Sequence, residues 1–289
     1  APGPPAGTPA AALLRRECLP EWGNYDEFAK HTSIESMDGM VGGVLRSEEC
    51  RKRWGTESLE IPEVPVMTEL DGLRLWFYLS DRIVGWGAIT GTYEADLVAA
   101  IRGTVKPGTN CCDVGANLGY FALLMAQSGA NVYAFEPFPK NLSLLDRNVR
   151  DNQLPGKIFV HPVAASDAAR KTVLCVDRQD SNYVGGFVPH NPEASRGFRS
   201  FEIQSCRIDD VVPASVRIDC VKMDIEGSEP MALRGMERIL RHDRPVVFFE
   251  FNPFAIEKHA GEPPRKITQW LTSLGYRITH LDGTGWSYS

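Results

Sequence analysis

The sequence predicts an α/β protein with a doubly wound, mostly parallel sheet, and two observations carry this prediction. After Thr92, short apolar runs alternate with helical patterns, which is typical of parallel strands whose connecting helices cover both faces of a sheet. Asp113 to Gly119 forms a glycine-containing turn between an apolar run and a helical segment. Such a turn is typical of the first strand–helix unit in nucleoside-binding folds of this class.

The expected elements follow one another along this part of the chain. Helices are expected at 93–104, 117–129, 140–152, 228–242 and 266–274, the second of them capped by Asn117. Parallel strands are expected at 110–114, 132–135, 158–162, 220–223 and 246–251. An extra pair of strands is expected at 172–176 and 201–206, and a closing hairpin at 276–281 and 286–289.

The first 87 residues differ in pattern from the rest and divide the chain into three parts. Residues 1–13, which are mostly Pro, Gly and Ala, predict a disordered tail. Residues 14–87 predict a helical segment followed by a β-hairpin around Asp71-Gly72, a pair that favours a type I′ turn. We interpret this segment as a lid or a dimer element, through which a homodimer would form. Residues 88–289 are expected to form the main domain.

Composition and charge restrict the classes of partner. A net charge of −6 argues against nucleic acid, because binding to a phosphate backbone normally requires a basic face. The sequence has no apolar run near the roughly 20 residues that span a bilayer, so we expect no integral membrane segment and a cytoplasmic protein. The seven cysteines lack a Cys-x-x-Cys pair and predict reduced thiols rather than a metal site.

Carboxylates at the expected strand ends point to a nucleoside cofactor. Asp113 and Glu136 follow two successive strands, and an acid at the second position can bind both ribose hydroxyls. We expect Gly115 and Gly119 to let the backbone approach the ligand without an intervening Cβ. The Gly-x-x-x-Gly spacing lacks the middle glycine that admits a pyrophosphate. S-adenosylmethionine, which carries a sulfonium, an ammonium and a ribose but no phosphate, therefore fits these acids better than NAD does.

Three stretches then carry a resemblance to a known family. Residues 113–121 (DVGANLGYF), 135–141 (FEPFPKN) and 222–229 (KMDIEGSE) resemble the FkbM-type S-adenosylmethionine-dependent methyltransferases. The resemblance extends over residues 73–289. It implies a Rossmann-like class I methyltransferase fold with seven strands, the last of them antiparallel. It also implies O-methylation of a hydroxyl on a small metabolite, sugar, secondary metabolite or glycan, with S-adenosylhomocysteine as the product.

The resemblance assigns roles to particular residues. It implies that Asp113, Gly115 and Asn117 line the methionine moiety, that Glu136 binds the ribose and that Glu94 closes the methionine side. Ser166 and Asp167 would lie near the adenine. The full expected set of cofactor-binding residues is Glu94, Asp113, Gly115, Asn117, Gly119, Glu136, Pro137, Ser166, Asp167 and Asp224.

Methyl transfer to a hydroxyl benefits from a general base, and three carboxylates are candidates. Asp224 is the first candidate, with Glu226 and Glu250 behind it; Asp224 and Glu226 could instead only cap the following helix. These three acids could also hold Mg²⁺, but nothing in their spacing demands a metal. Asn182, Tyr183 and His190 are candidate acceptor contacts. A nicotinamide-dependent oxidoreductase and a catalytically silent cofactor-binding domain remain the alternatives.

Overall fold

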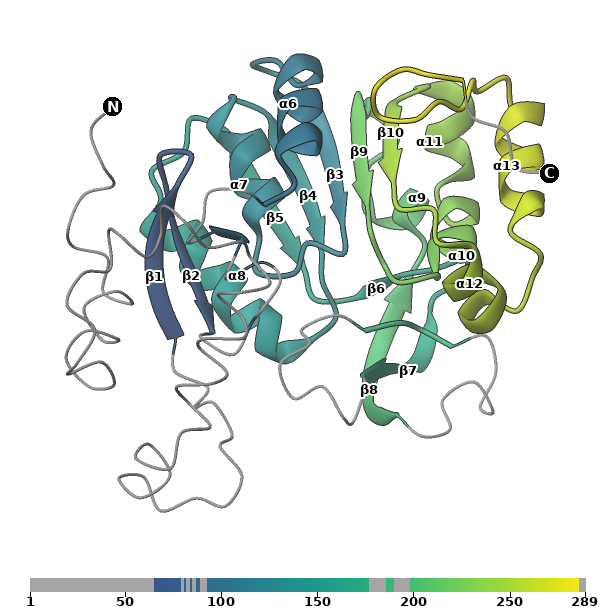
Figure 1. Ribbon diagram of the computed structural model, residues 1–289, viewed down its shortest axis with the longest axis horizontal. Coiled ribbons are helices and arrows are strands. Elements are labelled where there is room, and N and C mark those ends of the chain that lie inside the picture. The colour runs from purple at the N-terminus through teal and green to yellow at the C-terminus, as the bar shows by residue number, and fades with distance from the viewer. Residues whose placement is uncertain are drawn as a thin grey trace, which may run out of the picture.

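The computed structural model describes residues 65–78, 81, 84, 87–88, 93–176, 186–189 and 198–285, and its centre is a five-stranded parallel sheet (Figure 1). The strands lie in the order β10-β9-β3-β4-β5. They are β3 (Asn110–Val114), β4 (Asn131–Phe135), β5 (Lys157–His161), β9 (Cys220–Met223) and β10 (Val246–Phe249). The chain winds outward from β3 in one direction and from β9 in the other. The predicted doubly wound α/β fold is confirmed.

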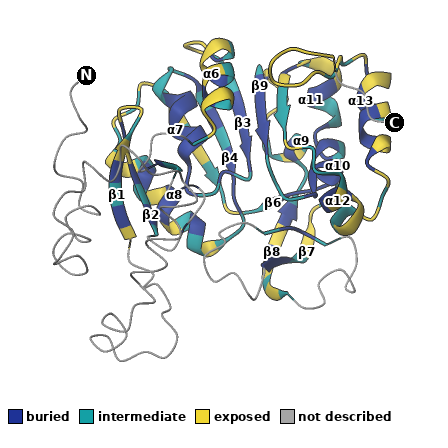
Figure 2. Ribbon diagram, viewed as in Figure 1, coloured by how far each residue is buried: buried dark blue, intermediate teal, exposed yellow. Residues whose placement is uncertain are grey.

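Helices cover both faces of this sheet, and the alternation of side chains along β3 shows it. Cys111 packs into one core with helices α6 (Ala95–Thr104), α7 (Tyr120–Gln127) and α8 (Pro139–Asp151). Cys112 and Val114 pack into a second core with α9 (Ile208–Val211), α10 (Glu229–Arg234), α11 (Glu237–His242) and α13 (Arg265–Ser273). Burial on both faces explains why the strands are apolar runs rather than alternating ones (Figure 2).

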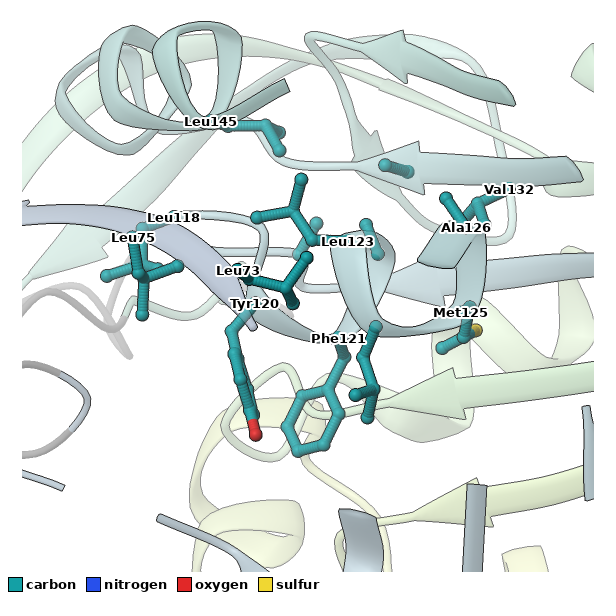
Figure 3. Close-up of a cluster of buried hydrophobic side chains, with 14 of the residues drawn as sticks. Leu73, Leu75, Leu118, Tyr120, Phe121, Leu123, Met125, Ala126, Val132 and Leu145 are labelled. Carbon is teal, nitrogen blue, oxygen red and sulfur yellow. The ribbon is translucent and has the colours of Figure 1, made fainter. Parts of the chain in front are cut away.

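The predicted hairpin packs against α7 and α8. Strands β1 (Pro65–Leu70) and β2 (Leu73–Tyr78) are antiparallel, and both Asp71 (φ 55°) and Gly72 (φ 77°) have the positive φ that a type I′ turn requires. Leu73 and Leu75 enter the same cluster as Leu123 of α7 and Leu145 of α8 (Figure 3). The hairpin therefore shares a core with the sheet, whereas the division of the chain at residue 87 remains a prediction.

Asn148 of α8 and Asn152, which caps the carboxyl end of that helix, bind the backbone of β2. Asn148 Oδ1 accepts from Trp76 N at 2.6 Å and its Nδ2 donates to Trp76 O at 3.0 Å. One helical turn later, Asn152 makes the equivalent pair with Arg74 N and O, at 2.9 and 2.7 Å. Asn148 Nδ2 also donates to Leu118 O at 2.8 Å, which ties the hairpin to the loop after β3.

A smaller sheet lies beyond the carboxyl ends of the parallel strands, in the lower part of Figure 1. Strands β7 (Arg170–Val176) and β8 (Arg199–Cys206) pair antiparallel, and the short β6 (Ala164–Ala165) pairs parallel to β8. The expected extra pair of strands is thus confirmed. Its position brings Ala164, Ala165 and Leu174 to the edge where ligands bind in open α/β sheets.

Two helix predictions were wrong, and tertiary contacts explain both. Asn117 does not cap α7: the N-cap is Gly119, with φ 94°, while the N–H of Asn117 donates to Glu136. The helix expected from 228 to 242 is interrupted at Gly235, because this residue packs against the Ser166 carbonyl, and a Cβ there would lie only 1.9 Å from that oxygen.

The carboxyl-terminal region differs from the expected hairpin. A single antiparallel bridge joins Thr279 to Gly285, and residues 286–289 lie outside the described part. Within the described residues the main sheet thus has five strands rather than the seven that were expected. Helix α12 (Pro253–Ala255) and the π-helical turn Ile256–Ala260 were not predicted. None of the described helices is long and apolar enough to span a membrane.

Candidate functional site

A cleft lies at the carboxyl ends of β3, β4 and β9, where the strand order reverses. The loops after these three strands and the small sheet line it, together with Tyr93, Tyr120 and Phe121. The cleft is open to solvent, and the empty space counted out to its mouth is about 840 Å³.

The loop after β3 forms one wall, and its two glycines lie in tight contact with neighbouring segments. A Cβ on Gly115 would lie 1.9 Å from the backbone oxygen of Asp224, and one on Gly119 would lie 2.3 Å from the Leu145 side chain. Both residues also have positive φ. These two glycines therefore allow this loop to pack against the loop after β9 and against α8. That they also let the backbone approach a ligand remains a prediction, and Gly115 lines the cleft.

Glu136 lies in the wall of the cleft at the end of β4, with 5% of its surface exposed. Its Oε2 accepts from Asn117 N and its Oε1 from Phe138 N, both at 2.8 Å. Burial raises the pKa of Glu136 to about 7, although these two N–H donors oppose the rise. The Asn141 side chain is a further hydrogen-bond donor to this carboxylate. The carboxylate thus joins the loops after β3 and β4 at the cleft.

Ser166 and Asp167 are placed behind the wall rather than in it. Ser166 is fully buried, and Asp167 forms an ion pair with Arg170 at 3.1 Å. The neighbouring Ala164 and Ala165 line the cleft instead, together with Phe138, Leu174 and Val188. This end of the cleft is therefore largely apolar.

Lys222 is the residue at the site that the sequence analysis missed. It lies in β9, is 5% exposed and lines the cleft. Its Nζ is 3.9 Å from Asp113 Oδ1, 3.8 Å from Asp224 Oδ2 and 3.3 Å from Gly115 O. The sequence does contain an indication of this role: a lysine inside an apolar strand such as 220–223 is rarely buried without a charged partner.

Asp113 is completely buried and is not among the residues that line the cleft. Burial raises its pKa to about 6, and the Lys222 ammonium opposes that rise. The Lys222 ammonium thus lies between Asp113 and the cleft. Asn117 and Pro137 do line the cleft, whereas Gly119 does not.

Three further carboxylates gather at the opposite end from Glu136. Asp224 and Glu226 line the cleft, and Glu226 adopts a left-handed conformation with φ 56°. Glu250, at the end of β10, lines an adjoining groove that shares Phe121, Lys222 and Asp224 with the cleft. Burial, reinforced by the charges of Asp224 and Glu226, raises the pKa of Glu250 to about 7.

The remaining candidates are distributed as follows. Glu94 is exposed, has φ 49° and lines the adjoining groove rather than the cleft. Asn182, Tyr183 and His190 lie outside the described residues. Across the described ranges, no three His, Cys, Asp or Glu side chains are grouped so that they could hold a metal ion.

An aromatic cluster beside the carboxylates was also missed. The rings of Tyr93, Tyr120 and Phe121 lie 5.2 to 6.0 Å apart in tilted and edge-on pairs. Burial and the neighbouring carboxylates raise the pKa of the Tyr93 hydroxyl. Aromatic faces beside carboxylates favour a cationic ligand.

Structural comparison finds methyltransferases of low sequence identity. The Pyrococcus abyssi tRNA (uracil-54, C5)-methyltransferase in complex with S-adenosyl-L-homocysteine is 17% identical, with a TM-score of 0.40, over 72% of this chain and 38% of that one. The Geobacter metallireducens precorrin-6y C5,15-methyltransferase is 12% identical, with a TM-score of 0.36, over 63% and 72% of the two chains.

The chain thus spans well under half of the first of these proteins, and no curated protein matches it. A family model decides the assignment. The methyltransferase FkbM domain matches residues 113–278, which is more than half of the chain and includes the loops that form the cleft. The chain therefore belongs to the FkbM methyltransferase family.

Proposed function

We propose that this protein is an S-adenosylmethionine-dependent O-methyltransferase. The observation that carries the proposal is the charge of the cleft: Glu136, Asp224 and Glu226 line it, beside the aromatic cluster of Tyr93, Tyr120 and Phe121. A ligand with a sulfonium, an ammonium and a ribose suits carboxylates and aromatic faces, whereas a pyrophosphate would be repelled.

The two ends of the cleft suggest how the cofactor lies. Glu136 would accept hydrogen bonds from the ribose hydroxyls, and the apolar walls around Leu174 and Val188 would enclose the adenine. The methionine moiety would then extend along the loop after β3 toward Asp224. Ser166 and Asp167 would support the adenine pocket from behind rather than contact the base, because neither lines the cleft.

The transfer step is an in-line displacement. The acceptor oxygen attacks the sulfonium methyl, the carbon–sulfur bond breaks, S-adenosylhomocysteine leaves and the hydroxyl proton passes to a base. Among the candidate bases the structure favours Glu250 over Asp224, because a pKa near 7 suits proton transfer at neutral pH. Asp224 instead pairs with Lys222, at 3.8 Å.

The acceptor would approach from the groove that adjoins the cleft, since Glu250 and Glu94 line that groove. We propose a hydroxyl of a small metabolite, sugar or glycan as the acceptor, as the resemblance of residues 113–121, 135–141 and 222–229 to the family implies.

Titration calorimetry with S-adenosylhomocysteine and, separately, with NADH tests the proposal. We expect S-adenosylhomocysteine to bind and NADH not to bind. Binding of NADH alone would support an oxidoreductase and overturn the proposal. Binding of S-adenosylhomocysteine without methyl transfer to any compound in a broad panel of hydroxylated acceptors would favour a silent cofactor-binding domain.

A further inference from the structure

We propose that Lys222 and Asp224 together bind the amino-acid end of the cofactor, Lys222 taking the α-carboxylate and Asp224 the α-ammonium. The inference rests on the proposed function and adds a recognition site to it. The carboxylate site is a single lysine, which begins the stretch 222–229 but is not in the expected set of cofactor-binding residues.

Both side chains face the same space. Lys222 and Asp224 lie two residues apart at the end of β9, so they project from the same face of the sheet. Both line the cleft, and Nζ lies 3.8 Å from Asp224 Oδ2. The amino-acid end of the cofactor is a zwitterion, because its α-ammonium and α-carboxylate are bonded to the same carbon atom. A cation and an anion at this spacing offer charges that are complementary to those two groups.

The Lys222 ammonium retains hydrogen-bonding capacity. It has three N–H donors, and within the described residues its one hydrogen bond goes to Gly115 O at 3.3 Å. The carboxylates of Asp113 and Asp224, at 3.9 and 3.8 Å, balance its charge at distances longer than a hydrogen bond. A ligand carboxylate can therefore receive a short, charge-assisted hydrogen bond from this ammonium.

The charges around the cleft fix the orientation. In the described wall Lys222 is the one cationic side chain, whereas Glu136, Asp224 and Glu226 are acidic. In this wall a ligand carboxylate finds a positive side chain at Lys222, whereas beside Glu136 or Glu226 it would meet like charge. The buried Asp113 lies on the other side of Lys222 and holds the ammonium at this point.

Three ligands separate this role from a structural one. S-adenosylhomocysteine carries the complete amino-acid end, its decarboxylated analogue lacks the carboxylate, and 5′-methylthioadenosine lacks the whole amino-acid end. In the wild type, calorimetry should show S-adenosylhomocysteine binding about 10- to 100-fold more tightly than the decarboxylated analogue, as expected for a charge-assisted hydrogen bond. A ratio near one in a protein that binds S-adenosylhomocysteine would overturn the inference.

The variant Lys222→Met should reduce that ratio to about one while leaving the affinity for 5′-methylthioadenosine unchanged. Equal weakening of all three ligands would assign Lys222 a structural role instead. Because Lys222→Met leaves the Asp113 charge buried without its counterion, the double variant Asp113→Asn/Lys222→Met, which removes both charges, is measured beside it.

Asp224→Asn tests the other half of the pair. It should abolish the discrimination against a deaminated analogue of S-adenosylhomocysteine and preserve the discrimination against the decarboxylated one. If the wild type binds none of these ligands, the proposed function fails and the inference with it. If the wild type binds S-adenosylhomocysteine but does not discriminate against the decarboxylated and deaminated analogues, only the inference is contradicted.

Discussion

At the end of the cleft near β4, Glu136 is 5% exposed and both of its oxygens accept backbone N–H groups at 2.8 Å. At the end near β9, the Asp224 side chain is 42% exposed and its ion pair with Lys222 spans 3.8 Å. The first end is fixed by short hydrogen bonds before any ligand arrives. At the second end, the charges of Asp224 and Lys222 balance each other at a distance longer than a hydrogen bond. The comparison suggests that one end positions the nucleoside while the other responds to the charges of the reacting groups.

The sharpest test of the reaction end is Glu250→Gln. We expect kcat to fall by about 10²- to 10⁴-fold, the usual contribution of a general base. A base must be ionised, so wild-type activity should rise as the pH increases through about 7, and the variant should lose this rise. Initial rates of methyl transfer between pH 6 and 9 measure both effects.

Asp224→Asn is the matched control at this end, because it removes a neighbouring carboxylate while Glu250 is retained. It should weaken cofactor binding and preserve the pH-dependent rise. If Glu250→Gln leaves the rate and its pH dependence unchanged while Asp224→Asn abolishes them, the base is Asp224.

The nucleoside end is tested by Glu136→Ala. The change removes a buried acceptor of two backbone hydrogen bonds and the proposed ribose ligand, so the Kd for S-adenosylhomocysteine should rise by about 10- to 100-fold. Glu136→Gln retains one carbonyl acceptor, so its Kd for S-adenosylhomocysteine should rise less than that of the alanine variant. Calorimetry gives both constants, and an unchanged Kd in the alanine variant would remove Glu136 from the binding site.

A buried acid beneath the reaction end should make stability depend on pH. Glu229 is 1% exposed, its Oε1 accepts from Ile225 N at 2.9 Å, and burial raises its pKa to about 8. A carboxyl pKa raised by folding stabilises the native state below the unfolded pKa, and this stability is lost as the pH rises through the folded value. The ligand-free protein should therefore lose at least about 1 kcal/mol of stability between pH 5 and 8.

Urea unfolding at the two pH values measures this loss. Glu229→Gln, which stays neutral, should reduce the dependence and leave the part that Asp113, Glu136 and Glu250 contribute through their own raised pKa values. Glu237→Gln, at a side chain that is 43% exposed, should leave the dependence unchanged. Identical slopes in the wild type and the Glu229 variant would exclude Glu229 as the cause.

The smallest effect concerns the support of the loop between the two ends. Asn148→Ala and Asn152→Ala each remove a pair of hydrogen bonds to β2 and should each cost about 1 kcal/mol or more of stability. Only Asn148 also donates to Leu118 O, in the cleft loop. Asn148→Ala should therefore raise the Kd for S-adenosylhomocysteine by a few fold, and Asn152→Ala should not; equal effects would show that the hairpin alone matters.

Local patterns were sufficient to predict much of the fold. Asp71-Gly72 has the backbone preference of its turn. The strands expected at 110–114 and 132–135 can be recognised because burial on both faces favours apolar side chains along most of their length. The break at Gly235 could not be predicted, since it arises from contact with Ser166, 69 positions earlier in the chain.

The candidate site was predicted less completely for the same reason. Glu136 and Asp224 follow strands, so the topology alone brings them to one edge of the sheet. That Lys222 lies between Asp113 and the cleft depends on the register of β3 with β9, which pairs Asp113 with Lys222. Pairing between strands more than 100 residues apart leaves no periodic signal in either strand.

The amides of Asn148 and Asn152 occupy the hydrogen-bonding groups of β2 on the side away from β1, where a third strand would otherwise add. An open strand edge is a template for pairing with another chain and for aggregation. Two side chains, one helical turn apart, thus close this edge to strand exchange between molecules, and any association of two copies through the hairpin must use a different surface.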